Sequence, residues 1–132
     1  MQLEKRIQAD IINSIREVHK DVKVWRNAVG GTRIGDGFMY FGLGKGSPDV
    51  VCVYKGMFFG IEVKTAFGVL EPHQEKCHKE WNEFGISVYV CRTTKDALDA
   101  VVAEKEKRDR YTLTDLTVDS KEEEDDTLCS IG

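Results

Sequence analysis

The chain has 132 residues, a length typical of one domain with its own hydrophobic core. No stretch approaches the ~18 apolar residues of a membrane-spanning helix, so we expect an intracellular, cytoplasmic protein with no membrane partner. Residues 1–108 carry 17 Lys and Arg against 15 Asp and Glu, whereas residues 109–132 carry 2 against 8. We therefore predict a folded domain over 1–108 and an acidic C-terminal extension over 109–132, and bulk charge gives no argument for nucleic-acid binding.

The first part of the chain is predicted to form a helix, a strand and two glycine-rich loops. Apolar residues recur at helical spacing over residues 2–20, and Glu4 lies on the flank of that stripe. From there it either reaches an active site or stays in solvent beside the helix start. Residues 22–29 resemble a strand, and the glycine-rich loops 30–37 and 42–47 enclose a strand or extended arm at 38–41. Neither loop has the spacing of a P-loop or dinucleotide motif, which argues against a nucleoside triphosphate site.

The second part alternates strands and helices. Residues 49–54 and 57–64 are predicted to be strands joined by a turn at 55–56, and a further buried strand is predicted at 86–91. A helix is predicted to start at Glu71-Pro72 and to end before Gly85, and another to span 95–107. Residues 111–118 form either a short strand or a docked extension. Helices on both faces of a mixed central sheet predict an α/β fold.

The four cysteines show no zinc-binding spacing. Those at positions 52 and 91 fall inside apolar strands, where reduced cysteine behaves as a small hydrophobic residue, so we expect a reducing compartment. His73 and Cys77 share a helix face, but no second pair accompanies them. We therefore interpret them, together with His78, as core and surface residues rather than as a metal site.

Polar residues cluster where the strands 49–54 and 57–64 begin and end. If these strands pair as a hairpin, Asp49 lies opposite the end of the second strand, where Glu62 and Lys64 share one face. Two carboxylates and an ammonium group then converge at one edge of the sheet. Buried charges are costly unless they are paired or bound to a metal, and a divalent cation satisfies them best. The alternative is an ion pair of Lys64 with one acid, but it explains neither the second acid nor the nearby glycines.

These residues resemble the PD-(D/E)xK nuclease superfamily, and most closely its VRR-NUC family. That family includes the nuclease domain of the Fanconi-associated nuclease and small standalone viral and bacterial proteins. The resemblance covers residues 2–102 and implies a restriction-endonuclease-like three-layer α/β/α sandwich with a mixed central sheet. It rests on an ordered set of features: Glu4, Trp25-Arg26-Asn27, Gly44-Lys45-Gly46-Ser47-Pro48-Asp49, Glu62-Val63-Lys64, Gln74 and Gly85.

The resemblance implies a divalent-metal-dependent endonuclease that hydrolyses phosphodiester bonds in DNA. Mg²⁺, with Mn²⁺ as a substitute, would be held by Asp49, Glu62 and the carbonyl of Val63, and Glu4 would complete the site. Lys64 would orient or deprotonate the attacking water, or offset charge on the phosphate. Gln74 would hold the phosphate, the water or the lysine. Three cations in or beside the glycine-rich loops would bind backbone phosphates or are ordinary surface residues: Arg26, Arg33 and Lys45.

Standalone members of the family act on branched DNA, so the resemblance favours a structure-selective enzyme acting on Holliday junctions in a viral or bacterial host cell. One site in a 15 kDa chain must pair with a second copy to cut two strands symmetrically, which predicts a homodimer. Two alternatives remain open. One is a restriction- or repair-type nuclease with a different DNA substrate, and the other is a non-catalytic DNA-binding subunit that retains the fold.

Overall fold

In a computed structural model of the chain, residues 3–110 are described. The chain divides after Val101 into two compact units, and a helical segment over residues 94–110 runs from the first into the second. This helix is longer than the predicted 95–107. The predicted strand or extension at 111–118, the charge run that follows it and Cys129 lie outside the described residues. The proposed boundary between a domain and an acidic extension at residue 108 stays a prediction.

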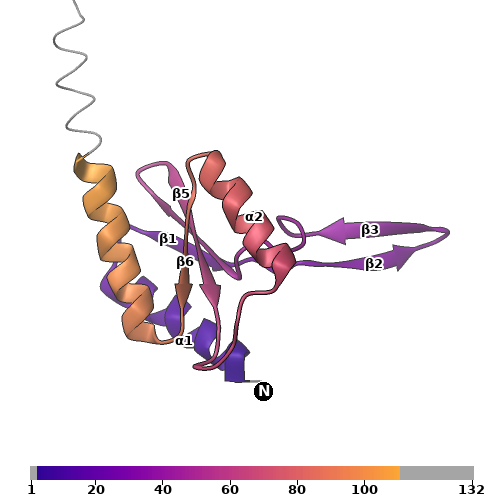
Figure 1. Cartoon of the computed structure of the whole chain (residues 1–132), viewed down its shortest axis with the longest axis horizontal. Coiled ribbons are helices and arrows are strands. Elements are labelled where there is room, and N and C mark those ends of the chain that lie inside the picture. Colours follow the sequence, from indigo (N-terminus) through magenta and orange to yellow (C-terminus); the bar gives the residue numbers. More distant parts are fainter. Residues whose placement is uncertain (1–2, 111–132) are drawn as a thin grey trace, which may run out of the picture. The chain divides into compact units, whose positions relative to one another are not determined.

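The first unit is built on a four-stranded mixed sheet (Figure 1). Its strands lie in the order β1-β4-β5-β6, with only β5 and β6 parallel among the pairs of this sheet. Parallel neighbours need a crossover connection, which here contains a helix. The elements are α1 (Leu3–Val18), β1 (Lys23–Arg26), β4 (Val50–Tyr54), β5 (Met57–Val63), α2 (Pro72–Glu83) and β6 (Ser87–Cys91). The predicted α/β class with a mixed central sheet is therefore confirmed.

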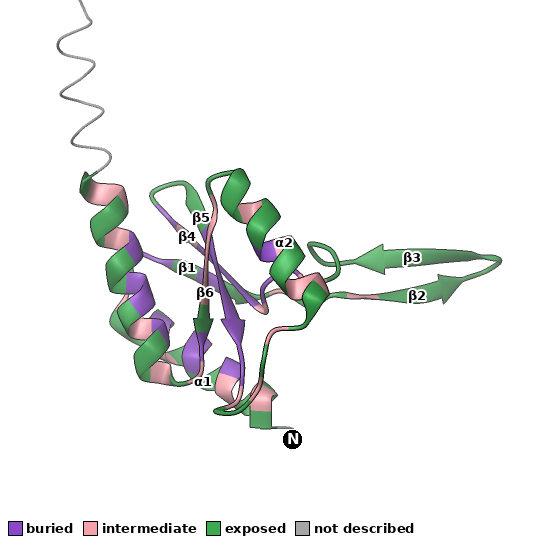
Figure 2. Ribbon diagram, viewed as in Figure 1, coloured by how far each residue is buried: buried purple, intermediate pink, exposed green. Residues whose placement is uncertain are grey.

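The hydrophobic core lies on one face of this sheet. Alternate residues of β4 and β5 point into it, as the two-residue period of a strand requires. Ile11 and Ile15 of α1 and Val101 of the last helix pack into the same cluster, and all three are fully buried. The strand residues that join the cluster are Val50, Cys52, Tyr54, Phe59, Ile61 and Val63. Figure 2 shows this burial along β4 and β5.

The opposite face of β5 allows a close approach by other parts of the chain. A Cβ atom placed on Gly60 would lie 2.5 Å from Pro48 and 3.4 Å from the ring of Trp81 in α2. The distance to Pro48 is shorter than van der Waals contact, so only glycine fits without a shift of Pro48, whereas the distance to Trp81 is an ordinary contact. Gly60 thus lets α2 and the segment before β4 lie close to the sheet.

The segment predicted as a glycine-rich loop at 30–37 is instead half of a β-hairpin. β2 (Gly30–Ile34) pairs with β3 (Gly37–Phe41) in a separate two-stranded sheet, which projects away from the central sheet in Figure 1. The predicted strand 22–29 is correspondingly shorter, because only Lys23–Arg26 pair with β4. Loop 42–47 is non-helical and unpaired, as predicted. No helix in the described part of the chain, residues 3–110, is long and apolar enough to cross a membrane.

Candidate active site

The turn between β4 and β5 determines which residues meet at the far end of these strands. Lys55 and Gly56 both have positive φ angles, +48° and +80°, as a tight two-residue hairpin turn requires. The register that follows pairs Val50 with Ile61, so the next positions outward, Asp49 and Glu62, lie opposite each other. Directly opposed residues of an antiparallel pair share a face. The structure thus brings together the two carboxylates that the sequence pattern predicted to converge.

Asp49 is anchored at the start of β4. Its Oδ2 accepts a hydrogen bond of 2.8 Å from the backbone N–H of Val63, and its own carbonyl accepts one of 2.8 Å from the N–H of Asn27. The pKa of Asp49 is raised to about 7, first by burial and then by a hydrogen bond with the Glu62 carboxyl group and by the negative charge of Glu62. The Val63 N–H and the charge of Lys64 act in the opposite direction. Two acids this close share a proton unless a cation neutralises them.

Glu62 is almost wholly buried, with 1% of its surface exposed, and both of its oxygens have partners on α2. His78 lies 3.0 Å from Oε1, and the amide nitrogen of Gln74 donates to Oε2 at 3.4 Å. Burial raises the pKa of Glu62, while the hydrogen bond with Asp49 and the positive charge of Lys64 lower it; the negative charge of Glu4 raises it again. Burial lowers the pKa of His78, which favours its neutral ring, and the tautomer with its hydrogen on Nε2 can donate that hydrogen to Glu62.

Gln74 is oriented by the start of α2 itself. The helix begins after Glu71 with Pro72 at its first position, and the Oε1 of Gln74 accepts a hydrogen bond of 2.9 Å from the Glu71 N–H. Because the amide oxygen is engaged in this cap, the amide nitrogen is turned toward Glu62. The side chain of Gln74 therefore faces the carboxylates rather than solvent.

Lys64 follows β5 directly, and only 8% of its surface is exposed. Its backbone N–H donates to the carbonyl of Cys91 on β6. The loop after it is fixed by Arg92, whose guanidinium donates to the carbonyls of Thr65 and Gly68, each at 2.6 Å. The positive charge of Lys64 lowers the pKa of both Asp49 and Glu62, so its ammonium group lies near the two carboxyl groups.

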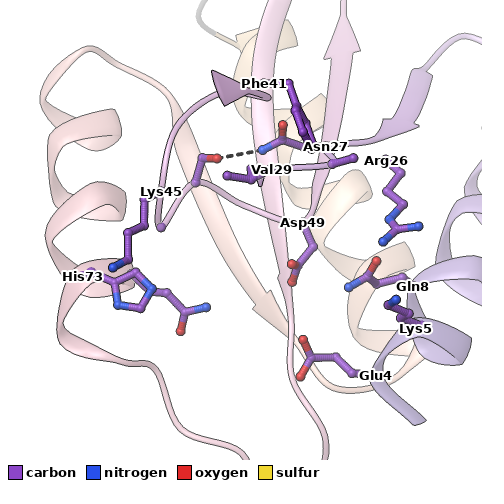
Figure 3. Close-up of a pocket in the computed structure, with 14 residues that line it drawn as sticks. Glu4, Lys5, Gln8, Arg26, Asn27, Val29, Phe41, Lys45, Asp49 and His73 are labelled. Atoms are coloured by element: carbon purple, nitrogen blue, oxygen red, sulfur yellow. Dashed lines mark hydrogen bonds between the residues drawn. The ribbon is translucent and has the colours of Figure 1, made fainter. Parts of the chain in front are cut away.

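A cavity of about 540 Å³ opens over Asp49 (Figure 3). Glu4 and Gln8 of α1 line it, and in Figure 3 their polar ends point toward the side of Asp49. Gln8 is buried, and it was not among the predicted site residues. The cationic residues of the lining lie on two sides of Asp49 in this view: Arg26 and Lys5 near α1, and Lys45 near His73.

The loop that leads to Asp49 is held by Asn27. Its amide nitrogen donates to the hydroxyl of Ser47 and to the carbonyl of Pro48, both at 2.8 Å, and its amide oxygen accepts from the N–H of Leu43 at 3.1 Å. Gly46 completes the arrangement, because its φ is +87° and a Cβ atom there would lie 2.5 Å from the carbonyl oxygen of His73. Gly46 therefore lets this loop pack closely against α2.

Some of the other predicted site residues line the cavity over Asp49, and others do not. Arg26 and Lys45 line the cavity, whereas Arg33 lies on β2 and does not line it. Within residues 3–110, no three His, Cys, Asp or Glu side chains form a group that could hold a metal, so Glu4 approaches Glu62 without completing such a cluster. His78 is buried, which agrees with its interpretation as a core residue, but its contact with Glu62 was not predicted. Its spacing of one helical turn from Gln74 was the available signal that both face Glu62.

The chemistry of the donor set fits a hard divalent cation. Mg²⁺ is commonly bound by one or two carboxylates and keeps several of its waters, so it does not require three protein side chains. Asp49 and Glu62 supply two carboxylates that repel each other when both are ionised. A cation between them would favour both ionised forms and so offset the burial that raises the pKa values of both groups.

Comparison with known proteins bears on the fold. A solved structure described as "VRR_NUC domain" matches with a TM-score of 0.53 and 20% sequence identity, over 74% of this chain and 92% of that chain. No family model matches the sequence, and no curated protein matches it either. At this identity the likeness concerns the backbone arrangement. The resemblance predicted from the sequence is confirmed at that level: the chain has the fold of a VRR_NUC domain.

Proposed function

We propose that this chain is a divalent-metal-dependent endonuclease that hydrolyses phosphodiester bonds in DNA. The observation that carries the proposal is the meeting of Asp49, Glu62 and Lys64 where β4 begins and β5 ends, beside an open cavity. The fold of a VRR_NUC domain supports it, because the site residues resemble those of the VRR-NUC nucleases.

Each residue of the site has a different proposed role in hydrolysis. Asp49 and Glu62, with the carbonyl of Val63, would hold Mg²⁺ or Mn²⁺, which lowers the pKa of a bound water and neutralises charge on the phosphoryl oxygens. Lys64 orients the attacking water or offsets the charge that develops on the phosphate. Gln74 and His78 fix the Glu62 carboxylate through one hydrogen bond to each oxygen.

The cations of the cavity lining account for binding of the DNA backbone. Arg26, Lys5 and Lys45 are exposed, flank Asp49 and are suited to phosphate oxygens on either side of the scissile bond. We extend the proposal to branched DNA such as four-way junctions and to a homodimer, since one site cuts one strand at a time. A monomer by light scattering at micromolar concentration would reject the dimer.

The test is a cleavage assay on four-way junction, flap and linear duplex DNA with Mg²⁺, Mn²⁺ or EDTA. We expect cleavage with either metal, none in EDTA, and at least a ~100-fold loss in Glu62→Gln. Glu83→Gln is the matched control, because that glutamate is exposed at the other end of α2. Full activity of Glu62→Gln would reject the proposal. Equal DNA binding with and without EDTA, but no cleavage, would instead indicate a DNA-binding subunit.

A further inference from the structure

One face of the β2–β3 hairpin combines aromatic rings with a cation. Side chains alternate along a strand, and the register pairs Gly31 with Tyr40 and Arg33 with Phe38, so these four residues share a face. We call it the aromatic face. Its two rings lie 4.9 Å apart, and Phe38 and Tyr40 keep 55% and 80% of their surfaces exposed. Monomeric soluble proteins rarely leave such neighbouring rings uncovered without a partner.

Glycine holds these rings against the backbone. A Cβ atom at Gly31 would lie 2.3 Å from the ring of Phe38, and one at Gly30 would lie 2.7 Å from the ring of Phe41. The rings therefore occupy space that any other residue of β2 would fill. On the aromatic face, Gly31 thus leaves room for the ring of Phe38 against the backbone, and a ring that is already placed loses less entropy on binding.

The aromatic face adjoins the candidate active site. A second cavity, of about 460 Å³, is lined by Phe38 and Tyr40 together with Val29, Phe41 and Lys45. The last three also line the cavity over Asp49. A polymer strand that occupies one cavity therefore continues into the other without leaving the surface.

The charge of this region matches a polyanion. Between residues 22 and 48 the only acidic residue is Asp36, which lies in the turn at the hairpin tip, whereas four residues are basic. Arg33 is exposed and makes no ion pair or hydrogen bond within residues 3–110. Aromatic rings with an adjacent arginine and a cationic path for the backbone are the components of surfaces that bind single-stranded nucleic acid.

We propose that the aromatic face binds unpaired nucleobases of the strand whose phosphates enter the cavity over Asp49. This inference rests on the proposed nuclease function and specifies its substrate as DNA with unpaired bases beside the cleavage point. In an intact duplex both faces of a base are stacked on its neighbours, so no face remains for Phe38 or Tyr40. An unpaired base at a branch, gap or flap offers one.

The experiment measures binding of the full-length protein in EDTA to fluorescent duplex DNA and to the same duplex with a short single-stranded gap. Tyr40→Leu and Phe38→Leu remove a ring but keep an apolar side chain, and Tyr40→Trp keeps a ring. Phe84→Leu is the matched control, because Phe84 is also exposed, 79%, but lies at the C-terminal end of α2. Stacking contributes about 1–3 kcal/mol per base, so each Leu variant should bind gapped DNA about 5- to 150-fold more weakly.

The proposal requires that Tyr40→Trp and Phe84→Leu bind gapped DNA as the wild type does, and that duplex affinity stays constant in all variants. Quenching of 2-aminopurine placed in the gap should disappear in the Leu variants. Unchanged gap affinity in Tyr40→Leu and Phe38→Leu would overturn the proposal, and so would an equal loss on duplex and gapped DNA. Conversion of a dimer to a monomer by these variants in sedimentation, with gap preference retained, would show that a second copy covers the face instead. Preferential binding of gapped DNA without metal-dependent cleavage would reject the proposed nuclease function but support the binding of unpaired bases by the aromatic face.

Discussion

The buried acid pair should make the metal-free protein less stable as pH rises, and Asp49→Asn should remove most of this effect. The unfolded carboxyl group ionises near 3.8, whereas burial and the neighbouring Glu62 raise the pKa in the fold to about 7. Between these values the folded protein binds more protons than the unfolded chain, so stability falls with increasing pH. The stability contributed by protonated Asp49 is fully present below pH 4 and is lost once the pH exceeds 7.

The magnitude follows from this difference. Each change of one in the pKa of a group on folding corresponds to about 1.4 kcal/mol of stability, so the full change from 3.8 to about 7 would correspond to about 4 kcal/mol. Asp49 is only half-buried, and solvent screening reduces the effect to about 1–2 kcal/mol. Asparagine keeps an oxygen that accepts the hydrogen bond from the Val63 N–H.

The assay is urea denaturation in EDTA at pH 5 and pH 8.5, for the wild type and for Asp49→Asn, with Asp10→Asn as an exposed control on α1. The wild type should lose about 1–2 kcal/mol between the two conditions, and the variant should be the more stable protein at pH 8.5. Mg²⁺ should raise the free energy of unfolding of the wild type at pH 8.5 and leave that of Asp49→Asn unchanged. A variant with the same pH dependence as the wild type would refute the reasoning.

Three further predictions concern contacts around the site. His78→Ala should weaken Mn²⁺ binding about 10- to 100-fold with an unchanged circular dichroism spectrum, and His78→Gln should restore part of it, because an amide can also donate to Glu62; equal affinities in all three proteins would contradict a positioning role. Asn27→Ala should cost about 1–3 kcal/mol in thermal unfolding and expose loop 42–47 to proteolysis, since three hydrogen bonds are lost; unchanged cleavage of that loop by protease would count against this. Gly60→Ala should cost about 1–3 kcal/mol because the methyl group would lie 2.5 Å from the ring of Pro48, whereas Gly56→Ala meets no atom within 4 Å and is strained only by its φ of +80°; a fully stable Gly60→Ala would show that the segment around Pro48 can shift freely.

Local patterns carried enough information to predict the centre of the site. The apolar runs on either side of Lys55-Gly56 and the two-residue turn between them determine a register, and that register places Asp49 opposite Glu62. The helix beginning at Pro72 was also predictable, since proline is common at the first position of a helix and glycine is common just after its end, as at Gly85. In each case, residues close in sequence decide the outcome.

The features that sequence analysis missed depend on distant packing. Glycines at 30 and 31 indicated a loop, but their lack of side chains makes room for Phe41 and Phe38 on the paired strand. This moved Arg33 from the expected phosphate site to the hairpin. His78 faces Glu62 only because α2 lies against the sheet at Gly60, a contact between residues far apart in sequence.

The most direct test of the central claim is a crystal of the full chain soaked in Mn²⁺, with the cation located by its anomalous scattering. The account predicts one or two peaks within about 2.0–2.6 Å of oxygens from both Asp49 and Glu62, with Lys64 beside them. A cation bound elsewhere, or coordinated by only one of these carboxylates, would contradict the claim that the strand ends form a shared metal site.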